Sequence, residues 1–270
     1  MEIVKAHAFG NDFLLLDEAA VPDGIDRARL ARSTCNRHRG LGGDGLIFYR
    51  RTTAPAAPSA TMQLLNADGS YSEVSGNGVR CLAAWLAHED DAAVGASITI
   101  ETDAGAKILA LLEQSGVSRT FRAAMGTPES LTRVSLMVDG RSVDAVTMRV
   151  GNPQCVVLGE VTEERLHGLA AKLAVHPHFA AGTNVELATV EDKNQVRILI
   201  WERGVGPTEA SGTGACAAAV AAMAYGGADR DVMVLSPGGQ QRVEWLDEGL
   251  FLTGSAEIIA VCAWQAPVAR

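Results

Sequence analysis

The sequence lacks three features that would assign it quickly to a common functional class. Its five cysteines are odd in number and form no C-x-x-C pair, so neither a disulfide framework nor a zinc site is predicted. Basic residues do not run together beyond Arg50-Arg51, and the net charge is −9, which argues against nucleic acid as the main partner. No apolar run reaches the roughly 18 residues that a membrane-spanning helix needs.

The beginning of the chain also lacks the pattern of a secretory signal peptide. Residues 1–7 show no basic region followed by an apolar stretch. Together with the scattered cysteines, this predicts a soluble, cytoplasmic protein whose thiols are reduced. With 270 residues, 47% of them hydrophobic, the chain is long enough for one large domain or two of ordinary size.

The most informative feature that is present is a short motif that occurs twice. Residues 73–78 (EVSGNG) and residues 209–214 (EASGTG) both read E-x-S-G-x-G, and each motif opens an alanine-rich apolar run. The two copies lie about half a chain length apart. Gly10-Asn11 and Gly151-Asn152 repeat at nearly the same separation, so two independent marks indicate an internal duplication.

Each half is predicted to contain many short strands around one apolar helix. Because a helix that is apolar nearly all round is a buried helix, we expect an α/β fold made of two pseudo-symmetric halves. Each half is a curved β-sheet or barrel wrapped around its central helix, with an active-site cleft between the halves. The predicted boundary is Gly126-Thr127-Pro128, which gives an N-terminal half of residues 1–125 and a C-terminal half of residues 126–270. The last strand, about 258–270, can belong to the first half.

Several local elements follow from capping and turn signals. A helix is predicted over residues 27–35 with Asp26 as its N-cap, and another from Thr162 as N-cap to about Leu173. Residues 97–102, 106–112 and 117–122 are predicted as a strand meander, and Thr52 to Ala60 as a surface loop or hairpin tip.

The start of each apolar helix is suited to an anion, because a glycine-rich helix start offers free backbone N–H groups and positive partial charge. Glu202 and Arg203 place a carboxylate and a guanidinium side by side, one suited to an ammonium group and the other to a carboxylate. Asn66, Asn152 and Asn184 lie beside turns and supply neutral donors and acceptors. Each group alone is typical of turns and solvated charges, but together they predict a binding site for an amino acid.

At these residues the sequence resembles the diaminopimelate epimerases, members of a cofactor-independent amino-acid racemase superfamily that includes proline racemase. The matching motifs keep the family's order over nearly the whole chain. They are Gly10-Asn11-Asp12-Phe13, Arg37-His38-Arg39-Gly40-Leu41-Gly42-Gly43-Asp44-Gly45, Asn66-Ala67-Asp68-Gly69-Ser70, Gly76-Asn77-Gly78-Val79-Arg80-Cys81, Gly151-Asn152-Pro153, Asn184-Val185-Glu186, Glu202-Arg203-Gly204-Val205-Gly206 and Gly212-Thr213-Gly214-Ala215-Cys216.

The resemblance implies two facing α/β halves, a homodimer, and an isomerase that uses no cofactor. It implies a two-base mechanism, in which one group removes the α-proton of LL-diaminopimelate and its partner protonates the opposite face. The product is the meso form, used for lysine and cell-wall synthesis. The residues implied to bind the non-reacting end of the substrate are Asn11, Asn66, Asn152, Asn184, Glu202 and Arg203. The backbone N–H groups of Gly76-Asn77 and Gly212-Thr213 are implied to hold the reacting carboxylate.

The chain departs from the family pattern at the acid and the base. The family has a cysteine before each G-x-G, whereas this chain has Ser75 and Ser211, and Gln154 replaces the histidine of the family's G-N-P-H. A free thiol has a pKa of about 8.5 and an alcohol resembles water, at roughly 15.7. The gap of about 7 units makes the anion roughly 10 kcal/mol harder to form. A helix start and neighbouring donors recover only a few units, so an alkoxide base is not expected.

The serine pair admits four interpretations. It can be a deliberate double replacement in a true epimerase, made to trap substrate or avoid oxidation. It can mark a natural branch with weaker or different chemistry, acting on another amino acid. It can belong to a binding protein that keeps the pocket without turnover. Finally, Glu73 and Glu209, each two residues before a serine, can form a displaced acid–base pair if burial raises their pKa.

Other candidate groups are weaker. Cys81 and Cys216 lie inside the apolar runs, where a cysteine is normally a small core residue. The Arg37-His38-Arg39 run can reach a substrate carboxylate or be the solvated end of a loop. The serines lack the G-x-S-x-G elbow of a hydrolase, and G-L-G-G-D-G lacks the Gly-Lys-Ser/Thr of a P-loop.

Overall fold

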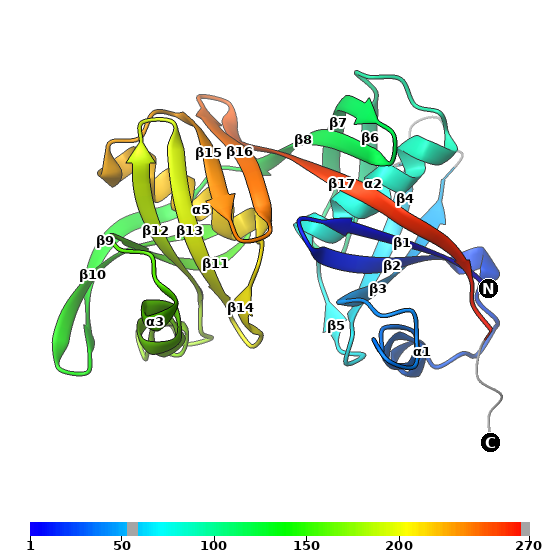
Figure 1. The fold of residues 1–270 in the computed structure, drawn as a ribbon, viewed down its shortest axis with the longest axis horizontal. Coiled ribbons are helices and arrows are strands. Elements are labelled where there is room, and N and C mark those ends of the chain that lie inside the picture. Colours follow the sequence, from blue (N-terminus) through cyan, green and yellow to red (C-terminus); the bar gives the residue numbers. More distant parts are fainter. Residues whose placement is uncertain (53–58, 266–270) are drawn as a thin grey trace. The chain divides into compact units, whose positions relative to one another are not determined.

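The computed structural model describes residues 1–52 and 59–265. Most of the predicted hairpin tip between Thr52 and Ala60, and the end of the predicted strand 258–270, therefore lie outside the described residues. The chain divides into two compact units, shown in Figure 1. Unit 1 consists of Met1–Ala123 and Ser255–Arg270, and unit 2 of Ala124–Gly254.

Unit 1 is a sheet that closes around a helix, α2 (Gly76–Glu89). The sheet closes because the long strand β17 pairs with both β1 and β8. The strands of this unit are β1 (Glu2–Ala8), β2 (Asn11–Asp17), β3 (Gly45–Arg51), β4 (Ala60–Asn66), β5 (Tyr71–Ser72), β6 (Ser97–Glu101), β7 (Lys107–Ser115), β8 (Ser118–Gly126) and the second part of β17 (Gly249–Ala263).

The core of unit 1 forms around α2 because this helix presents apolar side chains on nearly every face. All of its residues from Asn77 to Ala87 are buried, as expected for a helix inside a barrel. The outer face of β2 and β3 is covered by α1 (Arg27–Thr34), which packs through Leu30 and Ala31. As predicted, α1 begins after Asp26, whose carboxylate accepts the backbone N–H of Arg29 at 2.9 Å. A short 3-10 turn, η1 (Glu18–Ala20), follows β2.

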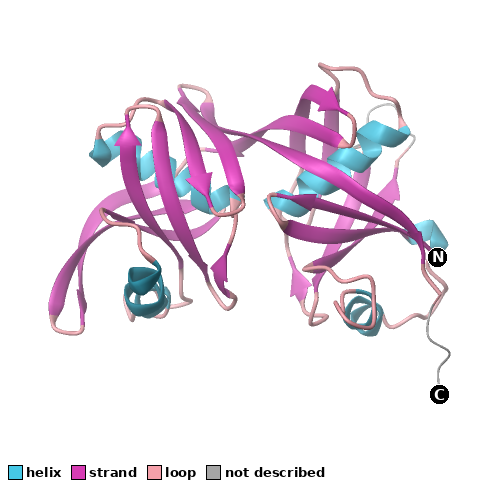
Figure 2. Cartoon of the chain, in the orientation of Figure 1, coloured by secondary structure: helices cyan, strands magenta, loops and turns pink. Residues whose placement is uncertain are grey.

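Unit 2 wraps its sheet around a second buried helix, α5 (Gly212–Ala221), as Figure 2 shows for the ribbon. Every residue of α5 except Thr213 is buried. The helix continues into a π-helical turn, η3 (Ala222–Gly226). The strands are β9 (Glu129–Val138), β10 (Arg141–Val150), β11 (Asn152–Leu158), β12 (Asn184–Asp192), β13 (Gln195–Glu202), β14 (Gly206–Thr208), β15 (Asp231–Ser236), β16 (Gly239–Leu246) and the first part of β17.

A second, shorter helical segment covers the other face of the unit 2 sheet. It consists of α3 (Glu163–Arg165), the π-helical turn η2 (Leu166–Ala170) and α4 (Ala171–Ala174). The predicted start is confirmed, because the Thr162 hydroxyl accepts the backbone N–H of Arg165 at 3.3 Å. Among the described residues, no helix is long and apolar enough to cross a lipid bilayer.

The two units repeat one topology, which confirms the predicted fold class. In unit 1, β2 and β3 are parallel, β4 is antiparallel to β3, and β6 returns parallel to β4 after α2. In unit 2, β11, β12, β13, α5 and β15 follow the same scheme. The registers also match. Leu15 pairs with Ile47 and Val156 pairs with Glu186, and Leu15 and Val156 lie equally far from Asn11 and Asn152. Ile47 and Glu186 therefore hold equivalent positions in the two units.

Candidate functional site

In unit 1, Ser75 is the N-cap of α2. Its backbone is extended (φ −127°, ψ 124°), and its Oγ accepts the backbone N–H of Gly78 at 3.2 Å. Serine is among the preferred N-cap residues because its oxygen satisfies one of the N–H groups that a helix start leaves without a partner. A Cβ on Gly78 would lie 3.0 Å from Cδ1 of Ile47, so the first turn of α2 packs closely on this side chain.

Two asparagines implied to bind substrate lie beside this cap and hold each other in place. Nδ2 of Asn77 donates to Oδ1 of Asn11 at 3.1 Å, and Nδ2 of Asn11 donates to Oδ2 of Asp44 at 2.7 Å. The other end of the Asn77 amide accepts from the buried guanidinium of Arg80. Both polar ends of Asn11 are thus engaged, so the protein fixes the orientation of this amide.

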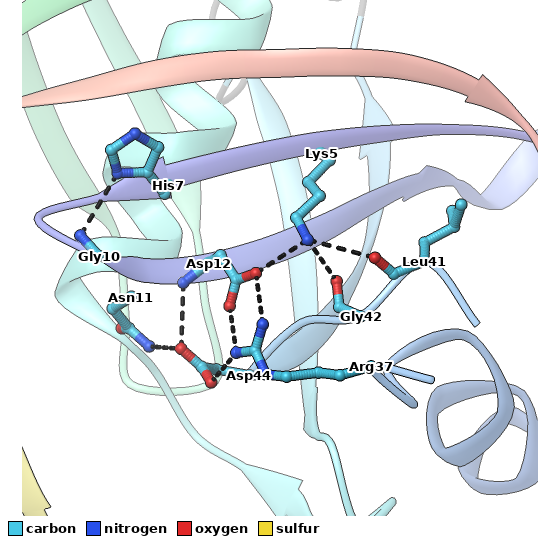
Figure 3. Close-up of polar contacts among 9 residues, drawn as sticks. All are labelled: Lys5, His7, Gly10, Asn11, Asp12, Arg37, Leu41, Gly42 and Asp44. Carbon is cyan, nitrogen blue, oxygen red and sulfur yellow. Dashed lines mark hydrogen bonds and ion pairs between the residues drawn. The ribbon is translucent and has the colours of Figure 1, made fainter. Parts of the chain in front are cut away.

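A charged network from the glycine-rich loop between α1 and β3 supports Asn11 (Figure 3). Arg37 donates to both carboxylate oxygens of Asp12, at 2.7 and 3.0 Å, and to Asp44 at 2.8 Å. Lys5 lies 3.0 Å from Asp12 and also donates to two carbonyl groups of the loop. Burial acts to raise the pKa of Asp12, but the hydrogen bonds and charges of Arg37 and Lys5 outweigh it and lower this pKa. Arg37 is therefore engaged by two carboxylates of its own chain.

Asn66 lies at the same end of the unit 1 sheet. It pairs with Gly45, the first residue of β3, and its Nδ2 donates to the Ser70 hydroxyl at 3.0 Å. Asn66 and Gly76 are both exposed. Of the predicted residues in this unit, Asn11, Asn77 and Ser75 are thus gathered at the start of α2, and Asn66 follows on a neighbouring strand end.

In unit 2, Ser211 repeats the role of Ser75. It is the N-cap of α5 with an extended backbone (φ −140°, ψ 128°), and its Oγ accepts the backbone N–H of Gly214 at 3.2 Å. Ser211 is buried, whereas Ser75 is half-buried. The predicted equivalence of the two serines is therefore seen in their local geometry.

The polar residues predicted in unit 2 gather at the strand ends near this helix start. Oδ1 of the buried Asn184 accepts the backbone N–H of Arg203 at 2.9 Å, and Nη1 of Arg203 donates to the carbonyl of Ala181 at 3.0 Å. Oδ1 of Asn152 accepts from Nε2 of Gln154 at 2.6 Å. The register of β11 and β12 places Gln154 directly beside Asn184. Asn152, Gln154 and Asn184 therefore form one polar group at the start of these two strands.

Unit 2 also buries a carboxyl group that sequence reasoning did not single out as a site residue. Glu186 is 0% exposed, and neither carboxyl oxygen has a hydrogen-bond partner among the described residues. Burial first, and then the nearby charge of Glu202, raise the pKa of Glu186 well above 4.5. A Cβ on Gly214 would lie 2.6 Å from Oε1 of Glu186, so the carboxyl group packs directly against the first turn of α5. The signal in the sequence was a single glutamate in the otherwise apolar strand start Val185 to Ala188.

The two alternatives to the serines gain no support from their surroundings. Glu73 and Glu209 are both exposed, so neither has the burial on which the displaced acid–base pair depends. Cys81 and Cys216 are fully buried inside their helices, as predicted. Burial raises the pKa of the Cys81 thiol to about 12, which makes it unsuited to replace the missing acid or base.

Comparisons with known proteins agree with this architecture. A profile of the diaminopimelate epimerase family matches residues 3–130 and 146–259. The diaminopimelate epimerase of Desulfitobacterium hafniense is 36% identical over 276 residues, covering 96% of each chain. That of Microcystis aeruginosa is 36% identical over 270 residues, covering 94% of this chain and 95% of the relative. The chain belongs to the diaminopimelate epimerase family.

The fold of this diaminopimelate epimerase family member is also similar to that of more distant solved structures. A hydroxyproline epimerase from Agrobacterium vitis has a TM-score of 0.71 at 15% identity, covering 97% of this chain and 91% of that one. A phenazine biosynthesis protein of the PhzF family from Bacillus anthracis has a TM-score of 0.73 at 15% identity, covering 97% and 98%. The two-unit fold is thus shared by proteins with different names and little sequence identity.

Within this family member, each helix start can bind an anion and donate a hydrogen bond. The first N–H groups of a helix have no acceptor within the helix, and the Ser211 hydroxyl takes that of Gly214. The N–H groups of Gly212 and Thr213, nearer the start, have no acceptor within the helix, and a helix start of this kind suits an anion. A serine hydroxyl at the cap can position a ligand or a water molecule, but it is far less acidic than the family's thiol.

Proposed function

We propose that this chain is a diaminopimelate epimerase in scaffold and substrate class, with its turnover impaired by Ser75 and Ser211. The reaction is the interconversion of LL- and meso-diaminopimelate by two-base proton transfer at the α-carbon, without a cofactor. The observation that carries the proposal is the geometry of the two serines. Each heads a buried helix as its N-cap, and each stands immediately before the G-x-G.

The substrate contacts proposed for this site follow the family motifs residue by residue. The backbone N–H groups of Gly76, Asn77, Gly212 and Thr213 hold the reacting carboxylate. The groups proposed for the non-reacting end are Asn11, Asn66, Asn152, Asn184, Glu202 and Arg203. Their positions support this proposal. Within each unit they lie at strand ends, near the start of the central helix.

The impairment follows from the acidity of a hydroxyl group. A hydrogen bond from the N–H of Gly78 or Gly214 favours an anion on the serine oxygen. Such a bond lowers the pKa of the hydroxyl group by only a few units. The remaining gap between alcohol and thiol still corresponds to several kcal/mol in the free energy of the base. The serines of this chain are therefore hydrogen-bonding groups, not proton-transfer groups.

Hydrogen exchange at the substrate α-carbon tests the proposal. The chain as it stands, incubated with LL-diaminopimelate in D₂O, is expected to exchange the α-hydrogen very slowly or not at all. The Ser75→Cys, Ser211→Cys double variant is expected to exchange it readily, and each single variant serves as a control with only one thiol. Fast exchange by the chain with both serines would contradict the argument from hydroxyl acidity. A double variant without exchange would contradict the assignment of diaminopimelate as the substrate.

A second candidate function is favoured by the same caps. Because both hydroxyl groups already serve as helix caps, the chain can be an amino-acid-binding protein, or an epimerase-fold isomerase acting on another amino acid without thiol chemistry. Calorimetry separates these functions. Tight binding of diaminopimelate with no exchange in either the serine or the cysteine form favours a binding protein, whereas weak binding favours another ligand.

The homodimer and the cytoplasmic location implied by the family also belong to the proposal. Sedimentation equilibrium of the full chain would test the dimer, with a concentration-independent monomer mass as the contrary result.

A further inference from the structure

The carboxyl group of Glu186 is not required by the fold. Its equivalent in unit 1 is Ile47, which packs against Gly78 at the start of α2 in the way that Glu186 packs against Gly214. The neighbouring equivalents are Phe13 in unit 1 and Gln154 in unit 2. One copy of the duplicated scaffold thus fills this space with hydrocarbon, and the other fills it with an acid and an amide.

The polar pair in unit 2 is unfavourable for folding. Gln154 and Glu186 are both 0% exposed, and Oε1 of Gln154 and both carboxyl oxygens of Glu186 have no hydrogen-bond partner in the described part of the chain. Buried polar atoms without partners destabilise a protein, whereas hydrocarbon at the same place stabilises it. A role outside folding is therefore the better account of Glu186.

The position of Glu186 connects it to ligand binding at α5. Its Oε1 lies against Gly214, whose N–H holds the Ser211 hydroxyl. One or two residues nearer the start are the N–H groups of Gly212 and Thr213, which have no acceptor within the helix. A helix start of this kind attracts one negative charge. A carboxylate on Glu186 and a carboxylate on a ligand would compete for it.

We propose that Glu186 is a positioning residue that controls anion binding at the start of α5. As the neutral acid it leaves the N–H groups of Gly212 and Thr213 to a ligand carboxylate, and as the carboxylate it becomes the anion that this helix start attracts. The inference rests on the proposed function for the identity of the ligand, an α-amino acid of the diaminopimelate class.

The groups around Glu186 favour the neutral acid. From β13 the facing titratable group is Glu202, a like charge that, after burial, raises the pKa of Glu186. On β11 the register partner of Glu186 is the apolar Val156. Cys155 lies on the opposite face of the sheet, and burial, followed by the charge of Glu186, raises the pKa of this thiol to about 12. None of these groups supplies a positive charge that would hold Glu186 ionised.

Calorimetric titration of the full chain with LL-diaminopimelate tests the control of binding. As the pH rises through the raised pKa of Glu186, the association constant of the unsubstituted chain is expected to fall, by up to about tenfold per pH unit once Glu186 ionises. Glu186→Gln keeps the shape of the neutral acid and is expected to remove this fall, while Glu186→Asp is expected to keep it. Glu248→Gln is the matched control, because it removes an exposed carboxylate of the same unit. Identical pH profiles for the unsubstituted chain and Glu186→Gln would overturn the proposal.

A second measurement needs no ligand and separates the two proposals. The amide resonances of Gly212 and Thr213 are expected to shift as Glu186 ionises in the unsubstituted chain, and to stay constant over the same range in Glu186→Gln. Amide resonances that do not titrate overturn the inference, whatever the ligand. If they titrate but diaminopimelate binds neither form at any pH, the proposed function fails and the control of this helix start by Glu186 stands.

Discussion

The tight contact between Gly214 and Glu186 leads to a quantitative prediction for the variant Gly214→Ala. The added Cβ would lie 2.6 Å from Oε1 of Glu186 and 3.2 Å from Cβ of Ser211, both closer than ordinary van der Waals contact. The Cβ of Ser211 is fixed by its own backbone, and the Glu186 carboxyl group is buried, so any shift must displace other packed atoms. Overpacking of this kind costs about 1–3 kcal/mol, and the helix propensity gained by replacing glycine returns about 0.5–1 kcal/mol. The difference between these two ranges is about 0–2.5 kcal/mol, so we expect a net loss of about 1 kcal/mol in the free energy of unfolding.

The first glycine of the other motif provides the control. A Cβ on Gly76 has no atom within 4 Å, so Gly76→Ala is expected to keep the stability or raise it by at most about 0.5–1 kcal/mol, the gain in helix propensity alone. Urea unfolding followed by circular dichroism measures both variants, and hydrogen exchange of the α5 amides locates the loss in unit 2.

A double-mutant cycle tests the cause. Because Glu186→Ala removes the atoms that collide, the double variant Gly214→Ala, Glu186→Ala is expected to be more stable than the sum of the two single effects, by about 1–2 kcal/mol. Strict additivity of the two changes would refute the placement of the carboxyl group against this helix turn.

Two further predictions concern charge. Because the pKa of Glu186 is raised above 4.5, the unfolded chain releases a proton above pH 4.5 that the folded chain retains. The unsubstituted chain therefore loses stability as pH rises toward the folded pKa, and Glu186→Gln is expected to become the more stable form by up to about 1.4 kcal/mol per pH unit in urea unfolding; a pH-independent difference would contradict this. Arg37→Met removes the main partner of Asp12, whose pKa lies below 3.8, so about 1–2 kcal/mol is expected to be lost at neutral pH after allowance for the exposure of Arg37. This loss should shrink as the pH falls below 3.8 and Asp12 is protonated in both forms, and an unchanged loss at low pH would point to packing instead of charge.

The features that the sequence predicts correctly depend on short-range patterns. The predicted caps Asp26 and Thr162 each accept an N–H group only three residues away, so the local sequence is sufficient to place them. The buried helices follow from runs in which almost no polar residue interrupts the alanines. Strand β9 (Glu129–Val138) was not predicted, because most of its residues are exposed and the alternation that signals a half-buried strand is weak.

The groups that sequence reasoning missed depend on contacts between distant parts of the chain. The pairing of Asp12 with Arg37 joins residues 25 positions apart, and the loop that carries Arg37 has no regular structure from which its direction could be derived. Glu186 sits in a strand whose alternation places it on the helix-facing side, but its complete burial depends on the packing of α5 against that face. The local sequence pattern is therefore sufficient to predict the helix starts. Only the tertiary structure shows which side chains pack against them.

The difference between the two helix starts bears on how a duplicated scaffold performs an asymmetric reaction. A two-base epimerisation needs one group protonated and its partner ionised before each turnover, so any difference in surroundings affects which of the two groups carries the proton. In unit 1 the turn after Ser75 packs on the hydrocarbon of Ile47, and in unit 2 the turn after Ser211 packs on the carboxyl group of Glu186. A thiol introduced by Ser75→Cys would respond mainly to its helix start, which favours the thiolate. A thiol introduced by Ser211→Cys would respond to Glu186 as well, because an ionised Glu186 opposes a second negative charge and a neutral one does not. Glu186 thereby makes the pKa of a group at position 211 different from that of a group at position 75. This asymmetry is present in the chain whether the two cap residues are serine or cysteine.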